Sequence, residues 1–313
     1  MIKTVFFGTP QLAIPIVETL HKTKNFKLLA CVTQPDRPVG RKKVMTPSAV
    51  KIWAEKKKIS VLTPTAFDKE FYDELLSISP KFDLIILAAY GLILPRKLLA
   101  LPKKDCLCLH PSLLPQYRGA SPVQATLMNG DQETGLTIFK MDEKMDHGPI
   151  VSQFKERVLP DETAEALYSR LFQLGAEVLT TMLPAYLEGR IKLRRQDDDQ
   201  ATYTKILTRN DGRINWHKAP AEIERFIRAM TPWPGAWTIV ELTQAGRRPL
   251  QKRMKVLSAR LEKKQIPNSQ FPIAKQQAPL IPNLVLDQVQ LEGKTPTFWK
   301  ELQKGYLEVK IVS

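Results

Sequence analysis

Short apolar runs alternate with amphipathic segments through the first part of the chain. Runs of strand length occur at 4–7, 28–32, 61–62 and 83–89, and segments of helical period occur at 12–17, 51–58 and 69–78. Residues 83–89 are almost continuously apolar, which is typical of a parallel strand that is buried on both faces. This alternation predicts an α/β domain built on an open, mostly parallel sheet.

The pattern changes in the second half of the chain. Apolar residues recur every three or four positions from 165 to 188, which predicts one long amphipathic helix. Residues 190–206 are highly charged and show no apolar period, so we interpret them as a linker between domains 1–189 and 207–313. After a further helical pattern at 220–230, short apolar runs separated by prolines favour a small, mainly β domain.

The positive charge of the chain is unevenly distributed. The 313 residues carry a formal net charge of +15. Residues 207–313 contain 18 basic and 9 acidic residues, whereas residues 1–189 contain 24 and 20. A lysine-rich solubilising surface would account for an excess of this kind. Its concentration in the C-terminal third instead favours a domain that binds a polyanion.

A second basic feature follows the strand predicted at 28–32. Residues 34–43 group four basic residues around one glycine and two prolines. One interpretation is a solvated surface turn. Together with the basic C-terminal domain, we favour a mobile loop that contacts phosphates through Arg41, Lys42 and Lys43.

The sequence lacks the signals of several classes of protein. The chain has no run of about 18 apolar residues, and its start resembles a strand rather than a signal peptide. Its three cysteines cannot form a disulfide framework, so we expect a cytoplasmic protein without membrane spans. The dinucleotide-binding fingerprint needs three glycines at fixed spacing, but Gly8 is followed by Thr9 and Pro10. No P-loop occurs either, so no nucleotide cofactor is expected.

A histidine lies at the end of one predicted strand. Strand alternation places Cys106, Cys108 and His110 on one face, and Pro111 restricts His110 to an extended backbone that ends the strand. A lone histidine is more often structural than catalytic. Ligands, however, usually bind at the carboxyl edge of a parallel sheet, and a carboxylate-rich segment containing Asp146 follows. His110 and Asp146 are therefore our candidate pair for proton transfer.

Two other chemistries could use the same residues. A metal site could use Cys106, Cys108 and His110. Zinc sites commonly have two to four residues between paired cysteines, whereas these cysteines are separated by one residue and successive same-face residues of a strand lie about 7 Å apart. No metal is therefore expected. Cys108 beside His110 could instead form an activated thiolate. Nothing else in the sequence supports such a covalent route.

Motifs in both halves of the chain resemble the methionyl-tRNA formyltransferase family. In the first half they are 7–10, 33–41, 89–95, 110–115, 117–122, 135–138 and 141–148, and in the second half 208–216 and 228–236. The histidine and aspartate motifs are shared by several formyl-folate enzymes. The C-terminal motifs narrow the resemblance, because glycinamide-ribonucleotide formyltransferases lack this second domain.

The resemblance implies both a fold and a reaction. The expected fold is a Rossmann-like, mostly parallel N-terminal domain followed by a small OB-like β-barrel that binds tRNA. The expected reaction moves a formyl group from 10-formyltetrahydrofolate, used as co-substrate, to the methionine α-amine of initiator methionyl-tRNA. A cytoplasmic monomer without a metal is expected. The alternatives are a sugar-nucleotide formyltransferase, a formyl-folate hydrolase, or a tRNA-binding protein with impaired catalysis.

The resemblance also assigns roles to individual residues. The implied catalytic residues are His110, Asp146 and Cys108, and the implied tRNA-binding residues are Arg41, Lys42 and Lys43. The implied folate-binding residues are Tyr90, Gly91, Leu94, Pro95, Ser112, Leu113, Leu114 and Pro115. Cys108 departs from the family, which has asparagine at this position. A thiol is a weaker donor on a shorter side chain, so we expect weaker stabilisation of the formyl oxygen.

Overall fold

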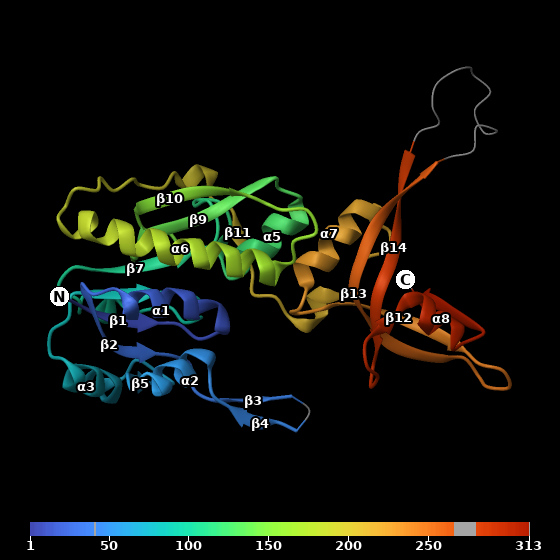
Figure 1. The fold of residues 1–313 in the computed structure, drawn as a ribbon, viewed down its shortest axis with the longest axis horizontal. Coiled ribbons are helices and arrows are strands. Elements are labelled where there is room, and N and C mark those ends of the chain that lie inside the picture. The colour runs from blue at the N-terminus through green and yellow to red at the C-terminus, as the bar shows by residue number, and fades with distance from the viewer. Residues whose placement is uncertain (41, 266–279, 313) are drawn as a thin grey trace, which may run out of the picture. The chain divides into compact units, whose positions relative to one another are not determined.

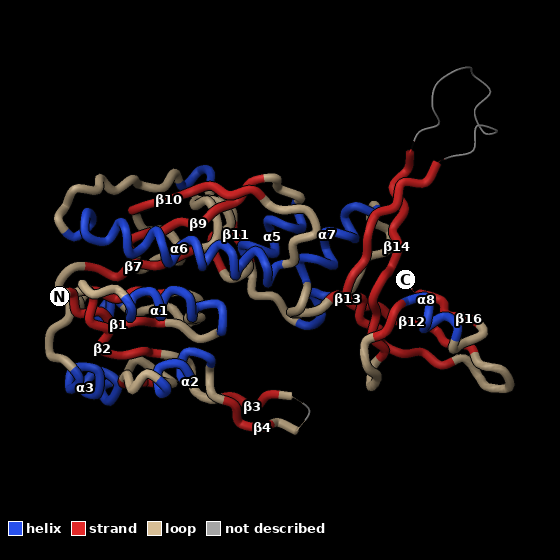
Figure 2. The backbone as a smooth tube through the Cα atoms, viewed as in Figure 1, coloured by secondary structure: helices blue, strands red, loops and turns tan. Residues whose placement is uncertain are grey.

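The computed structural model of the protein describes residues 1–40, 42–265 and 280–312 (Figures 1 and 2). The chain divides into two compact units. Unit 1 consists of Met1–Pro122, Glu133–Arg157 and Leu167–Lys205, and unit 2 consists of Val123–Gln132, Val158–Ala166 and Ile206–Ser313. Two short segments of the predicted domain 1–189 therefore belong to unit 2, which the sequence pattern did not indicate.

Unit 1 is built on a seven-stranded sheet with the order β10-β9-β7-β6-β1-β2-β5. Strands β7, β6, β1, β2 and β5 are parallel, and β9 and β10 are antiparallel to their neighbours. Their bounds are β1 (Ile2–Phe7), β2 (Phe26–Val32), β5 (Ser60–Leu62), β6 (Leu84–Leu87), β7 (Asp105–His110), β9 (Glu133–Lys140) and β10 (Ile150–Arg157). The predicted mostly parallel α/β sheet is confirmed.

Polar side chains cap two of the helices of unit 1, α2 (Ala49–Lys56) and α3 (Lys69–Ile78). The others are α1 (Ile14–Lys22), preceded by a 3-10 turn at Gln11–Ala13, α4 (Arg96–Leu99) and α6 (Ala164–Leu187), whose first residues belong to unit 2. Ser48 accepts the Lys51 N–H at the start of α2, and Asp68 accepts the Phe71 N–H at the start of α3. Each cap satisfies a backbone donor that the first helical turn leaves unpaired.

Alternation along the strands separates the two faces of the sheet. Phe7 of β1 and Cys108 of β7 belong to the same core cluster as Phe71 and Leu75 of α3. On the other face, α6 approaches the sheet at Gly175, where a Cβ would press against the side chains of Leu109 and Leu136. A glycine at this point lets the helix pack closely on β7 and β9.

The basic segment predicted as a loop is partly a hairpin. Strands β3 (Arg37–Val39) and β4 (Val44–Thr46) pair in antiparallel fashion, with Gly40 in the left-handed region at φ 73°. The loop prediction is wrong for β3, whereas β4 lies just beyond the predicted segment 34–43. Their residues are exposed, so no buried face imposes a period on the sequence. Lys42 and Lys43 are exposed at the turn, and Arg41 lies outside the described residues.

The segment interpreted as a linker belongs to unit 1 as far as Lys205. Its strand β11 (Tyr203–Thr204) pairs with β8 (Arg118–Gly119), and a 3-10 turn covers Asp198–Gln200. Arg194 exchanges two backbone hydrogen bonds with Ile150, of 2.8 and 2.9 Å. The segment has no apolar period because it is held by hydrogen bonds rather than by an apolar face.

Unit 2 contains a five-stranded antiparallel sheet with the order β15-β14-β13-β12-β16. Its strands are β12 (Ala236–Thr243), β13 (Leu250–Gln265), β14 (Leu280–Leu291), β15 (Thr297–Phe298) and β16 (Glu308–Val312), and its helical elements are α5 (Pro122–Asn129), the 3-10 turn η3 (Arg209–Gly212), α7 (Pro220–Met230) and α8 (Trp299–Lys304). Ile223 and Ile227 of α7 pack with Val240 and Met254 of the sheet. The expected C-terminal domain is thus confirmed as an antiparallel β domain.

Helix α7 forms hydrogen bonds with two segments of unit 2 that lie far from it in the sequence. In unit 2, the backbone carbonyls of Met128 and Glu162 accept hydrogen bonds from Arg225 and Arg228 of α7, which ties both N-terminal segments to this helix. Among the described residues, no helix combines the length and apolar character needed to cross a membrane.

Candidate active site

The carboxyl ends of β1, β6 and β7 meet at one edge of the sheet. The chain places β2 on one side of β1 and β6 on the other, and ligands of open α/β sheets bind at such a switch point. The loops that follow these strands are tied together. The Tyr90 carbonyl accepts hydrogen bonds from the Thr9 hydroxyl at 3.2 Å and from the Gln34 amide at 2.8 Å.

His110 is the last residue of β7, as predicted, and only 5% of it is exposed. Its Nε2 lies 2.9 Å from the backbone carbonyl oxygen of Tyr117. Because a carbonyl oxygen only accepts, Nε2 carries the proton in the neutral ring. The unprotonated Nδ1 then faces Asp146, with 3.7 Å between Nδ1 and Oδ2. The ring therefore presents its lone pair toward the carboxylate.

Asp146 is held in an uncommon backbone conformation. Its φ of +50° lies in the left-handed region, and its Oδ2 accepts the Gly119 N–H at 2.7 Å. The gap between Asp146 and His110 is longer than an ordinary hydrogen bond. A substrate group that exchanges a proton could approach both side chains there.

Cys108 lies two residues before His110 and is buried among the core residues beneath the site. Burial raises the pKa of its thiol well above the ordinary value, and the negative charge of Asp146 raises it further. The thiol therefore stays protonated at neutral pH, which argues against the thiolate alternative. Among the described residues, no group of three or more histidine, cysteine or acidic side chains is arranged to hold a metal ion.

The loop after His110 is fixed by its own hydrogen bonds. The Ser112 hydroxyl donates to the Gln116 carbonyl at 2.6 Å, and the Leu114 N–H donates to Thr137 Oγ1 at 3.1 Å. Gln153 donates to the Leu114 carbonyl at 2.9 Å. Ser112 and Leu114 are buried, whereas Leu113 and Pro115 are half-buried.

The second predicted folate segment, residues 90–95, contains both buried and exposed residues. Tyr90 and Leu94 are 1% and 2% exposed, so their side chains belong to the core rather than to an open surface. Burial raises the pKa of Tyr90 to about 12. Gly91 is exposed with a φ of 87°, and Pro95 is exposed as well. Any ligand on this segment would meet its backbone and its exposed residues.

Comparison with known proteins identifies the family. Residues 2–183 match the family model described as formyl transferase, and residues 206–307 match that of the formyl transferase C-terminal domain. The methionyl-tRNA formyltransferase of Bacillus cytotoxicus is 40% identical over 239 residues, which cover 76% of this chain and 75% of that protein. That of Bacillus cereus strain B4264 is 39% identical over the same coverage. The chain belongs to the methionyl-tRNA formyltransferase family.

Solved structures share the fold at low sequence identity. An N-formyltransferase from Helicobacter canadensis in complex with folinic acid and dTDP-3-aminofucose has a TM-score of 0.63 and 19% identity, covering 91% of this chain and 99% of that chain. A sugar 3N-formyltransferase with dTDP and 5-N-formyl-THF has a TM-score of 0.62 and 18% identity, covering 94% and 99%. At this identity the likeness concerns the fold alone.

A buried arginine beside the site was missed in the sequence. Arg118 of this formyltransferase-family chain is 2% exposed, and its guanidinium donates to Gln196, Asp198 and Tyr203. The hydrogen bond from Arg118 lowers the pKa of Asp198. His147 lies between two carboxylates, 2.6 Å from Asp142 and 3.2 Å from Asp198. No local pattern marks the contacts of Arg118 and Asp198, because their partners lie 51 to 85 residues away along the chain.

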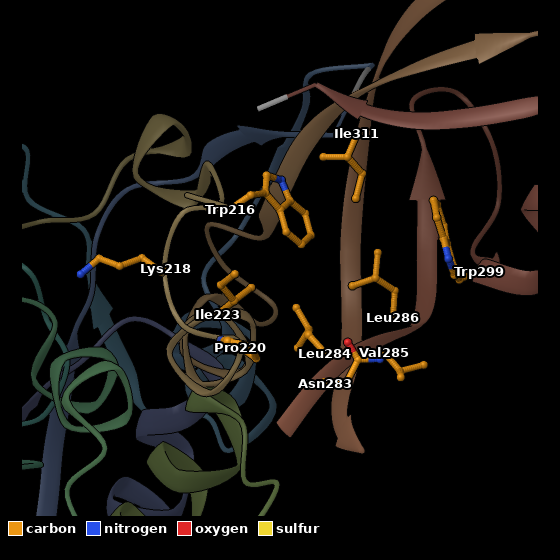
Figure 3. A pocket seen from close by; sticks show the side chains of 10 residues that line it. All are labelled: Trp216, Lys218, Pro220, Ile223, Asn283, Leu284, Val285, Leu286, Trp299 and Ile311. Carbon is orange, nitrogen blue, oxygen red and sulfur yellow. The ribbon is translucent and has the colours of Figure 1, made fainter. Parts of the chain in front are cut away.

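A cavity of about 410 Å³ in unit 2 is separate from this chemistry (Figure 3). It is lined by Trp216, Lys218, Pro220, Ile223, Asn283, Leu284, Val285, Leu286, Trp299 and Ile311. Among the described lining residues, Lys218 alone is charged, and these residues offer no acid–base pair for formyl transfer.

The state of the cysteines can be tested directly. Cys31, Cys106 and Cys108 are all buried, and burial raises the pKa of each thiol. We expect the folded protein to resist iodoacetamide at about pH 8, since only thiolates react. After unfolding in guanidinium chloride, mass spectrometry should find all three cysteines alkylated. Rapid labelling of Cys108 in the folded chain would instead support an activated thiolate.

Proposed function

We propose that this chain transfers the formyl group of 10-formyltetrahydrofolate to the α-amine of methionine on initiator methionyl-tRNA. The observation that carries the proposal is the His110–Asp146 pair at the carboxyl edge of the sheet, in a chain of the methionyl-tRNA formyltransferase family. The matching C-terminal model and the basic residues of unit 2 favour tRNA over a small acceptor.

In the proposed reaction, the methionine nitrogen forms a bond to the formyl carbon, and the bond from that carbon to N10 of the folate breaks. The amine loses a proton and N10 gains one. His110 can hold the proton at Nδ1, because Nε2 is committed to the Tyr117 carbonyl. Asp146 then faces the imidazolium and offsets its charge. The protonated Nδ1 can also donate toward the formyl oxygen as negative charge develops there.

The proposed folate site lies between the two segments that follow β6 and β7. Leu113 and Pro115 offer half-buried surface, and Gly91 and Pro95 offer exposed surface. Ser112, Leu114, Tyr90 and Leu94 act as buried supports that shape these segments. Pre-organised loops of this kind bind a ligand without a large ordering cost.

The proposed tRNA contacts come from two basic surfaces. In unit 1, the β3–β4 hairpin presents Lys42 and Lys43, and Arg41 lies outside the described residues. The start of α2 is anchored to the same region by an ion pair of 2.9 Å between Lys51 and Asp36. Exposed lysines on a projecting hairpin suit contact with a phosphate backbone.

In unit 2, basic side chains gather around Trp237 and form what we call the Arg–Trp cluster: Arg209, Arg213, Arg253, Lys255 and Trp237. The Arg253 guanidinium stacks 3.7 Å from the centre of the Trp237 ring, and Arg213 lies 5.9 Å from it. The Trp237 N–H donates to the Arg209 carbonyl at 2.8 Å. Lys255 faces Trp237 across β12 and β13.

The Arg–Trp cluster has excess positive charge. Burial and the charge of Arg209 lower the pKa of Arg253, although Glu292 opposes this. Within the described residues, no ion pair involves the four basic side chains of the cluster. Guanidinium groups held this way suit phosphate oxygens, and a stacked tryptophan suits bases or sugars.

The proposed function is tested by a formylation assay on the purified chain. With 10-formyltetrahydrofolate and initiator methionyl-tRNA, we expect formyl-methionyl-tRNA to accumulate at the rate at which tetrahydrofolate appears. Parallel reactions with a dTDP-linked amino sugar or with no acceptor should release little tetrahydrofolate. Faster turnover in either of these would favour a sugar-nucleotide formyltransferase or a hydrolase. Binding of tRNA in a gel shift without any turnover would indicate an RNA-binding protein.

Replacing Cys108 by asparagine should raise the rate of the proposed reaction. The amide would add a stronger donor toward the formyl oxygen, and such a donor changes kcat by up to about 10²–10³-fold. We expect kcat to rise in C108N while the two KM values change little. The matched control is C106N on the same face of β7, where no gain is expected. An unchanged or lower kcat in folded C108N would show that Cys108 does not limit the reaction.

Neutralising the exposed part of the Arg–Trp cluster should weaken tRNA binding. We expect the Arg209→Gln/Arg213→Gln double variant to raise KM for tRNA several-fold with little change in kcat. The slope of log affinity against log salt should fall by about 1 for each phosphate that the variant no longer neutralises. The control is Arg247→Gln/Arg248→Gln, which removes the same charge from exposed positions in the turn after β12. Equal effects of the two double variants would indicate a diffuse charge effect rather than a defined contact.

A further inference from the structure

We infer that Gln196 is a positioning residue for the carboxylate of Asp146, an inference that rests on the proposed function. The Gln196 Nε2 donates to the backbone carbonyl of Asp146 at 2.9 Å and to that of Gly148 at 2.8 Å. Both bonds hold the backbone that carries the carboxylate. Gln196 comes from the segment that the sequence pattern indicated to be a linker.

The orientation of the Gln196 amide is fixed by its other partner. Its Oε1 accepts from Nε and Nη2 of Arg118, at 3.1 and 2.8 Å. A guanidinium only donates, so the amide oxygen must face Arg118 and the amide nitrogen must face the Asp146 backbone. The partners of the amide oxygen and those of the amide nitrogen therefore require the same orientation of the Gln196 side chain.

Arg118 is itself held by hydrogen bonds from both its side chain and its backbone. Its Nη2 donates to Asp198 Oδ1 at 2.7 Å, and its Nη1 donates to the Tyr203 hydroxyl at 3.3 Å. Its backbone N–H donates to the Thr202 carbonyl at 2.8 Å. The next residue, Gly119, donates its N–H to the Asp146 carboxylate. Asp146 is therefore held through its carboxylate by β8 and through its backbone by Gln196.

Asp146 lies in the left-handed region of backbone conformation. Aspartate adopts this region more readily than most residues with a side chain, but it is still uncommon, and surrounding hydrogen bonds stabilise it. Without the two hydrogen bonds from the Gln196 amide, the segment can relax toward a right-handed backbone conformation. That change would turn the carboxylate away from His110. A displacement of about 1 Å at a reacting centre lowers the rate by on the order of 100-fold.

Gln196→Glu tests the inference most sharply. Its carboxylate still accepts from Arg118, but it cannot donate to the Asp146 and Gly148 carbonyls and repels them instead. We expect kcat to fall by roughly 10- to 100-fold, with both KM values nearly unchanged. The control is Gln200→Glu in the same segment, where the exposed amide donates to the Asp197 carboxylate at 2.7 Å and kcat should be retained. If Gln196→Glu fails to fold, Gln196→Met removes both donors at similar length.

Two readouts separate positioning from general stability. In an Asp146→Ala background, Gln196→Glu should cause no further loss of kcat if it acts through that carboxylate, whereas a general structural defect would add to the loss. Hydrogen exchange of peptides covering 141–150 should accelerate in Gln196→Glu and not in Gln200→Glu. Unchanged kcat and unchanged exchange in Gln196→Glu would overturn the inference. Absence of formyl transfer in the unmodified chain would instead overturn the proposed function, and the exchange measurement would still test the hold on Asp146.

Discussion

The buried guanidinium of Arg118 imposes a constraint on which the site depends. A charged group removed from water must have its donors satisfied, or the fold loses several kcal/mol. Here Gln196, Asp198 and Tyr203 supply the acceptors, and all three come from one segment about 80 residues away along the chain. Satisfying Arg118 therefore draws this segment onto unit 1. The same contacts bring the Gln196 amide against the Asp146 backbone, so a requirement for burial also shapes the site.

The fold brings the remaining parts of the site together through strand topology. His110 ends β7, and the chain then passes through β8, α5 and β9 before it reaches Asp146. The Tyr117 carbonyl then fixes which nitrogen of His110 bears the proton, and Gly119 fixes the carboxylate. Tyr117 and Gly119, in the segment after β7, thus fix the protonated nitrogen of His110 and the position of the Asp146 carboxylate. The pair is defined by its backbone surroundings as much as by its side chains.

The sequence predicted features whose cause is local. Helices α3 and α7 have the predicted bounds because Asp68 caps the first and Pro220 begins the second. The end of β7 at His110 follows from Pro111 in the same way. What could not be predicted is held by polar contacts between distant segments, as for Gln196 and Arg118, or is exposed on both faces, as in the β3–β4 hairpin. Such contacts leave no period in the sequence.

In the proposed reaction, the position of Asp146 matters more because residue 108 is a cysteine. The buried thiol stays protonated and donates only weakly, so it offers little stabilisation to a formyl oxygen. In the proposed reaction, the Nδ1 of His110 that has taken up the amine proton then carries more of the developing charge, with Asp146 Oδ2 3.7 Å away. A chain with asparagine at this position would have a second donor to share the charge. With Cys108, the proposed reaction relies on the hydrogen bonds of Gln196 and Gly119 to keep one donor in place.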